Sequence, residues 1–153
     1  MDIFGGQLDP NQFIFRPHKY LGDFTLLSTA HGGPAVNTSL SVTLRGNEMF
    51  FIILRLMAVG LGGESGTAIH WRTQIYTSTS QRYHSSGIVN GNDRVRDECL
   101  WGNASRPAVL PLAIIIPGSS SILLDLESLD LSQDANLHLV FDGLQAFPKG
   151  SGK

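Results

Sequence analysis

The chain has 153 residues, of which 42% are hydrophobic and 16% charged, and this length suits a single domain with a substantial core. Lysine and arginine number 11 against 13 aspartate and glutamate residues, a formal net charge of −2. This balance argues against a nucleic-acid-binding protein, which would carry a basic patch or stripe. The single cysteine, Cys99, excludes an intrachain disulfide, and we expect it to be a small core residue rather than a nucleophile.

No segment has the pattern of a signal peptide or of a membrane-spanning helix. Residues 1–6 lack a charged region followed by an apolar one. The longest apolar run, residues 49–59, is too short to cross a bilayer and contains Arg55. We therefore expect a soluble protein, made in a cytoplasm, with no membrane partner.

Alternation with a period of two dominates from about residue 24 to residue 147, and no stretch has a helical period. The clearest strand places Val36, Leu40, Val42 and Leu44 on one face of a sheet. Glycine, proline, asparagine or aspartate closes each apolar segment. In chain order, we expect strands near residues 22–28, 35–44, 49–59, 67–78, 83–101 (the least defined), 108–116, 120–131 and 136–147.

Eight strands in about 125 residues predict an all-β fold, a single eight-stranded antiparallel jelly-roll sandwich with an extended N-terminal arm. We place the arm at residues 1–20 and the jelly-roll domain at residues 21–148. Residues 149–153 contain no core-forming side chain and are predicted to be a flexible tail.

Two of these strands, residues 49–57 and 109–116, are apolar on both faces. The outer face of an antiparallel sandwich is usually solvated, so each strand needs a second cover. The N-terminal arm, a long loop or another subunit could provide it, and an arm could also cover a strand of the next subunit. Arg55 needs an acidic partner from another strand or subunit. Without separating core from interface, we select Phe13, Phe15, Phe50, Ile52, Leu54, Ile114 and Ile116 as interface candidates.

Charge is unevenly distributed along the second half of the chain. Residues 107–148 contain no lysine or arginine but several acidic residues, whereas arginines are frequent in residues 66–106. These charges are either ordinary solvated side chains or complementary patches that meet between subunits or on a partner. For contacts to an acidic partner we select Arg82, Arg94, Arg96 and Arg106.

Catalytic and metal-binding patterns are missing. No two histidines have the spacing of metal ligands, and His70 lacks the second histidine that a cupin strand would carry. Asp125 and Glu127 share a strand face, as a glycosidase pair could, but solvated charges explain them. We therefore predict that the protein has no catalytic residue, metal or cofactor and that it is not an enzyme. Among the exposed aromatic candidates, Trp71 is expected to point inward, while Tyr76 and Tyr83 could contact a sugar.

The order of features resembles a group of tailed-phage virion proteins with a single jelly-roll domain. The match covers about residues 20–147. It consists of several short segments in the same order along the chain rather than of one motif. These segments are residues 47–53 (NEMFFII), 74–78 (QIYTS), 100–102 (LWG), the proline-bounded 107–117, 121–126 (SILLDL) and 137–145 (LHLVFDGLQ).

The resemblance implies a capsid decoration or cement protein, located in the virion. Such subunits are often homotrimers that sit between capsomers, so the implied partner is the major capsid protein or another virion protein. Some relatives serve in head fibres or tails, which leaves a tail, baseplate or head-fibre module binding a host glycan as the alternative. Few charges and excess apolar strand surface are compatible with either function.

Overall fold

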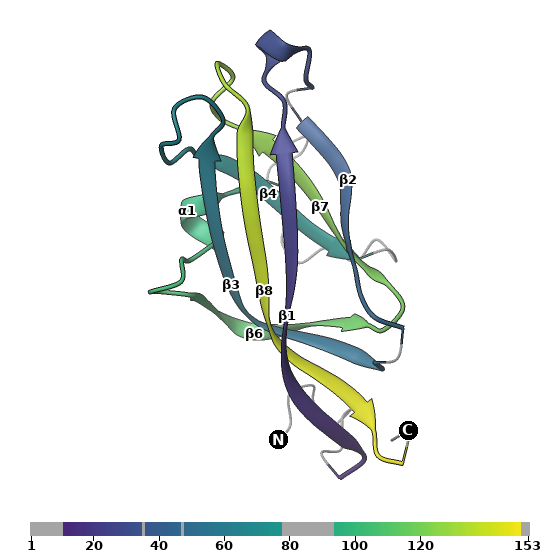
Figure 1. Ribbon diagram of the computed structural model, residues 1–153. Coiled ribbons are helices and arrows are strands. Elements are labelled where there is room, and N and C mark those ends of the chain that lie inside the picture. Colours follow the sequence, from purple (N-terminus) through teal and green to yellow (C-terminus); the bar gives the residue numbers. More distant parts are fainter. Residues whose placement is uncertain (1–10, 35, 47, 78–93, 151–153) are drawn as a thin grey trace, which may run out of the picture.

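The computed structural model describes residues 11–34, 36–46, 48–77 and 94–150. Within these residues the chain forms two four-stranded antiparallel sheets that pack as a β-sandwich (Figure 1). The elements are β1 (Phe13–Leu26), η1 (Thr29–His31), β2 (Val36–Thr43), β3 (Phe50–Gly62), β4 (Trp71–Thr77), β5 (Val95–Arg96), α1 (Asp97–Leu100), β6 (Ala108–Pro117), β7 (Ser121–Ser128) and β8 (Ala135–Pro148).

The strand order is β1-β8-β3-β6 in one sheet, here called sheet A, and β2-β7-β4-β5 in the other, sheet B. The predicted all-β class is therefore confirmed. Both helices in the described residues are short: η1 is one 3₁₀ turn and α1 has 4 residues.

The core between the sheets follows the period of two. In β7, Ile122, Leu124 and Leu126 are fully buried while the residues between them are half-buried. Trp71 points inward as predicted, with 3% of its surface exposed. It packs against β3 at Gly60, where an added Cβ would lie 2.3 Å from the indole ring. Only glycine lets the two sheets approach this closely here.

One predicted face assignment is wrong. The alternation puts Val36 on the same face as Leu40, but the β2–β7 register shifts between Asn37 and Leu40. Ser39 adopts a left-handed conformation there, with φ of 57°. A bulge of this kind moves later residues to the opposite face. Val36 therefore lies opposite Glu127 on the outer face, while Leu40 packs against the core.

The first strand begins at Phe13 rather than near Gly22, so residues 13–20 of the predicted arm are strand residues. They pair with residues 141–148 of β8. Pro17 lies inside this strand, which sequence reasoning disfavours because proline cannot donate a ladder hydrogen bond. β1 is an edge of sheet A, and an edge strand tolerates the missing donor.

The predicted fifth strand is only partly described, because residues 78–93 lie outside the described residues. Its remaining part contains the two-residue strand β5 and the single turn α1. Cys99 is exposed on this turn, so its predicted core position is wrong. In this turn Leu100, and not Cys99, packs against the core.

Candidate functional site

The predicted interface residues fall into two groups on opposite faces of sheet A. Ile114 and Ile116 belong to the core cluster between the sheets, so we remove them from the candidate interface. Ile52 is also fully buried but lies outside that cluster. The strand register places it on the outer face, between Leu144 of β8 and Ile115 of β6.

The remaining aromatic candidates surround Ile52 on this outer face. Phe50 and Phe15 both pair with Ala146 of β8, and the rings of Phe13 and Phe50 lie 6.2 Å apart. Their contact is edge-on, an arrangement that aromatic pairs favour. Leu54 is half-buried where the β3 register shifts. We call the group on the outer face the outer cluster: Phe13, Phe15, Phe50, Ile52, Ile115, Leu144 and Ala146.

A second set of apolar side chains, absent from the interface candidates chosen from sequence, is far more exposed. Leu112 and Val109 of the edge strand β6 are 79% and 72% exposed. Leu21, Val59 and Leu61 are also exposed, and they lie on strands β1 and β3. Large apolar side chains exposed on one sheet offer contact area to a partner. We call Leu21, Val59, Leu61, Val109 and Leu112 the exposed apolar set.

The exposure of Leu112 has a local cause. The β3–β6 register runs from Ile53 opposite Ile114 to Arg55 opposite Val109. Residues 110–113 therefore form a bulge opposite one residue of β3, and Pro111 within it cannot donate a ladder hydrogen bond. The bulge carries Leu112 outward from β6, which is an edge strand of sheet A within the described residues. The continuous apolar run does not distinguish this bulge from a regular strand, and Pro111 is the sequence signal that favours an edge or a bulge here.

Arg55 has the acidic partner that the sequence required. Its Nε lies 2.9 Å from Oδ2 of Asp142, and the two side chains form an ion pair across the β3–β8 ladder. The Asp142 side chain is 11% exposed and that of Arg55 50%. The pair thus satisfies a nearly buried carboxylate on the outer face of sheet A.

The outer face of sheet B is polar by contrast. Arg72 and Arg94 both approach Oε2 of Glu127, at 3.7 and 3.9 Å. Tyr76 donates from its hydroxyl to Asp125 at 3.0 Å, and Asp125 also accepts the Ser39 N–H at 3.1 Å. This last bond occupies the donor that the β2 bulge frees.

The predicted arginine contacts are only partly brought together. Arg94 lies at the edge of sheet B, with its side chain 21% exposed. Arg96 is more exposed and approaches Glu98 at 3.6 Å. Arg106 is exposed in the turn before β6. Arg82 and Tyr83 lie outside the described residues.

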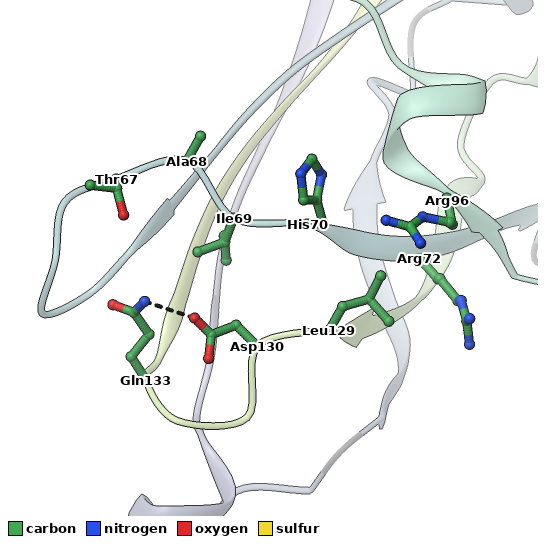
Figure 2. A pocket seen from close by; sticks show the side chains of 9 residues that line it. All are labelled: Thr67, Ala68, Ile69, His70, Arg72, Arg96, Leu129, Asp130 and Gln133. Carbon is green, nitrogen blue, oxygen red and sulfur yellow. Dashed lines mark hydrogen bonds between the residues drawn. The ribbon is translucent and has the colours of Figure 1, made fainter.

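A groove of about 450 Å³ opens beside β4 and β5. Figure 2 shows the lining side chains. They come from the β3–β4 loop, the start of β4, the end of β5 and the β7–β8 loop. Gln133 donates to Asp130 at 2.8 Å along one wall. Ser132 and Gln133 hydrogen bonds lower the pKa of Asp130. The lining residues are Thr67, Ala68, Ile69, His70, Arg72, Arg96, Leu129, Asp130 and Gln133.

His70, at this groove, lies between two carboxylates. Its Nδ1 is 3.1 Å from Oδ2 of Asp97 and 3.1 Å from Oε1 of Glu98. Within the described part of the chain, these three residues form the set that could hold a metal ion, since one ligand atom of each lies within 4.8 Å of the others. Asp97 also accepts the Trp71 N–H at 3.2 Å, and Arg96 neighbours Glu98. These bonds account for the arrangement by tying α1 to β4, and we assign no metal to it.

A further histidine links three loops at one end of the sandwich. His31 Nδ1 lies 2.8 Å from Oδ1 of Asp134, and its Nε2 lies 3.8 Å from Glu64. The hydrogen bond to Asp134 raises the pKa of His31. The Ser28 N–H, 2.7 Å from the same carboxylate, and His31 lower the pKa of Asp134. The pair is a structural tie between loops.

One buried carboxylate has no signal in the sequence pattern. Glu48 is 4% exposed and accepts a hydrogen bond from the Tyr20 hydroxyl. Burial, followed by the Glu48 hydrogen bond, raises the pKa of Tyr20. The same hydroxyl accepts the Arg45 N–H at 2.9 Å. This network joins β1 to the β2–β3 loop.

Comparison of the chain with family models, curated proteins and solved structures gives no match. Neither helix among the described residues has the length and hydropathy needed to cross a membrane.

Proposed function

We propose that this chain is a structural virion protein, a capsid decoration or cement subunit with a jelly-roll fold. The observation that carries the proposal is the exposed apolar set, which gives sheet A a surface suited to association. The sequence resemblance supplies the class of partner: the major capsid protein or another virion protein. The contribution would be mechanical, because buried area between neighbouring subunits opposes their separation.

The strand pairing supports the jelly-roll part of this proposal. β1 pairs with β8, β2 with β7, β3 with β6 and β4 with β5, all antiparallel. The chain thus pairs its first half with its second half in reverse order, as one long hairpin. Wrapping such a hairpin into two sheets gives the paired Greek keys of a jelly roll.

We also propose a homotrimer that uses β6 for subunit contact. An edge strand with exposed large apolar side chains is a site for association, and natural proteins normally protect such edges. Val109 and Leu112 are the most exposed members of the apolar set. Closed symmetry would bury this edge once in each subunit.

The test is to purify virions from cells that produce this chain and to quantify the chain in them. Wild-type protein and Val109→Ser/Leu112→Ser protein would then be rebound to particles from which it has been stripped. We expect wild-type protein to bind and the variant to lose at least about tenfold in affinity, a change of about 1.4 kcal/mol. Leu131→Ser is the matched control, because Leu131 is 47% exposed but lies between β7 and β8, outside sheet A.

Virions that lack the chain, or a variant that rebinds like wild type, would contradict the proposal. The arginines give a second comparison. Arg94→Ala/Arg96→Ala should weaken attachment to the particle and leave the fold intact. Arg16→Ala/Lys19→Ala removes the same amount of charge from β1 and should leave attachment unchanged. Equal particle occupancy for both double variants would remove the arginines from the contact.

The second candidate is a tail, baseplate or head-fibre module that binds a host glycan. Tyr76 favours it, because its half-buried side chain lies on the polar outer face of sheet B. Its hydroxyl donates to Asp125 and lies 3.3 Å from the Ser39 hydroxyl. A ring with adjacent hydroxyl and carboxylate groups suits a sugar. A glycan array showing binding that Tyr76→Ala abolishes would support this function over the cement function.

A further inference from the structure

The exposed apolar set forms two separate patches on sheet A. Val109 and Leu112 lie on the edge strand β6. Leu21, Val59 and Leu61 lie on β1 and β3, the two strands on either side of β8. Two patches in different places give one chain two different contact surfaces, which is what a head-to-tail contact between copies requires.

The patch on β1 and β3 borders a groove of about 250 Å³ on the outer face of sheet A. The strand register places Asp23 of β1 and Val59 of β3 on opposite sides of His138. Val59 and Leu61 make one wall of the groove apolar, and the other wall carries the Asp23 carboxylate. Asp23 is hydrogen-bonded to Nδ1 of His138, and its side chain is 76% exposed. Because a carboxylate has about four acceptor sites, Asp23 can accept a further donor.

The β6 edge begins at a hydrogen-bonded turn. The segment between α1 and β6 projects from the side of the sandwich (Figure 1). Oδ1 of Asn103 accepts the N–H groups of Ser105 and Arg106 at 3.0 and 2.8 Å, a turn closed by an asparagine side chain. Arg106 is exposed in this turn, three residues before Val109. The edge therefore presents a basic side chain and an apolar one from an ordered backbone.

The groove and the β6 edge complement each other, since each combines apolar side chains with a charge of opposite sign. They cannot meet within one chain. The order β1-β8-β3-β6 separates β6 from β1 by three strand spacings, about 14 Å at about 4.8 Å each, which is farther than an arginine side chain reaches. Val109 pairs with Arg55, four residues before Val59 on β3. A second copy supplies the matching surface.

We propose that the groove of one copy receives the β6 edge of the next copy. Val109 of that edge packs on Val59 and Leu61. Arg106 pairs with Asp23. A contact between two different surfaces closes into a ring when the rotation between neighbouring copies allows it, whereas a β6-to-β6 contact would use one surface twice and give a dimer. The proposed contact depends on the homotrimer of the proposed function and specifies the surface that its β6 edge meets.

Disulfide cross-linking between copies tests this contact. Two full-length proteins, Cys99→Ser/Leu61→Cys and Cys99→Ser/Val109→Cys, are co-expressed and oxidised. We expect a mixed dimer that joins residues 61 and 109, identified by non-reducing electrophoresis and peptide mass spectrometry. The matched control replaces the second protein with Cys99→Ser/Thr43→Cys, because Thr43 is exposed on β2 in sheet B. The mixed dimer should form in at least about tenfold higher yield than the control dimer, since the assembly raises the effective concentration of the two cysteines.

Light scattering on the same proteins distinguishes the ways in which the contact could fail. A trimer in which residues 61 and 109 cross-link no better than the control pair would overturn the contact and leave the homotrimer. A protein that stays at 16.6 kDa would overturn both. Disulfides that join two copies of residue 109 as readily as residues 61 and 109 would overturn the contact in favour of a β6-to-β6 pairing.

Charge reversal gives a readout without engineered cysteines. Asp23→Lys and Arg106→Glu should each weaken association at least about tenfold, because each places like charges together. Asp23→Lys/Arg106→Glu in one chain should restore association. Asp23→Lys/Arg16→Glu should not, because Arg16 lies near the other end of β1. No restoration by the first pair, or equal restoration by both pairs, would overturn the pairing of Arg106 with Asp23.

Discussion

The outer face of sheet A and the outer face of sheet B belong to the same sandwich but differ in chemistry. Around Ile52 the outer face of sheet A is apolar across all four strands, and the ion pair of Arg55 with Asp142 lies beside that region. The outer face of sheet B carries the bonds of Arg72 and Tyr76 to carboxylates of β7. Both sheets share one core, so folding alone does not require the difference. It indicates that sheet A is built to be covered and sheet B to face water.

The largest expected difference in stability between variants of the two faces lies at the centre of the outer cluster. Ile52→Ala should lower the free energy of unfolding by about 2–5 kcal/mol, the range for core isoleucines, because Ile52 is fully buried. Leu123→Ala, at a half-buried position of β7 on the outer face of sheet B, should lower it by about 1 kcal/mol or less. Urea unfolding measures both. Equal losses at the two positions would remove the contrast between the faces.

The ion pair of Arg55 with Asp142 gives a second test of the difference between the two outer faces. Arg55→Met should destabilise the protein by about 1.5–3 kcal/mol, because it leaves the nearly buried Asp142 carboxylate without its charged partner. Asp142→Asn should have a smaller effect, since it leaves the half-exposed Arg55 able to reach water. Chemical denaturation of both variants at pH 7 tests the order, and a larger loss for Asp142→Asn would contradict it.

On sheet B the loss of a single polar contact should lower the free energy of unfolding by less than the changes on sheet A. Tyr76→Phe removes the hydrogen bond to Asp125 and should lower the free energy of unfolding by about 0.5–1.5 kcal/mol. The ring and its packing remain, so the variant isolates the hydroxyl. A loss as large as that of Ile52→Ala would mean that the polar face is as important to stability as the outer cluster.

The smallest expected effect lies in the loops and depends on pH. The pKa of His31 is raised above 6.5 in the folded state, so its contact stabilises the protein below pH 6.5 and is lost as the pH rises through the raised value. The pKa of Asp134 is lowered below 3.8, so its contribution is present above pH 3.8 and is lost as the pH falls through the lowered value.

His31→Ala should therefore lower the thermal midpoint more at pH 5 than at pH 8.5. Differential scanning calorimetry at the two pH values checks this expectation. The same difference from wild type at both values would show that the charge of His31 contributes nothing measurable.

Much of the fold was predictable because period-two alternation reflects burial directly. The β7 strand and the inward position of Trp71 are both predictable on that ground. The same rule cannot separate faces where both are apolar, so Ile52 and Ile114 are equivalent in the sequence pattern although the register places them on opposite sides of sheet A. The Ser39 bulge left no signal at all, because serine in a left-handed conformation cannot be read from sequence.

The candidate site was less predictable because it depends on contacts far apart in the chain. The sequence required a partner for Arg55 but could not select Asp142. His70 meets Asp97 because β5 and α1 return to the edge of β4, and their sequence spacing resembles no ligand motif. The exposure of Leu112 follows from a bulge whose apolar residues continue the pattern of a regular strand.

The most direct test of the central claim is the mass of the isolated protein, measured by light scattering after size exclusion. One chain has a mass of 16.6 kDa, and a trimer joined through the exposed apolar edge of β6 should give three times that mass. Val109→Ser/Leu112→Ser should shift the mass to that of one chain. A wild-type protein that stays at 16.6 kDa across concentrations would contradict association through sheet A.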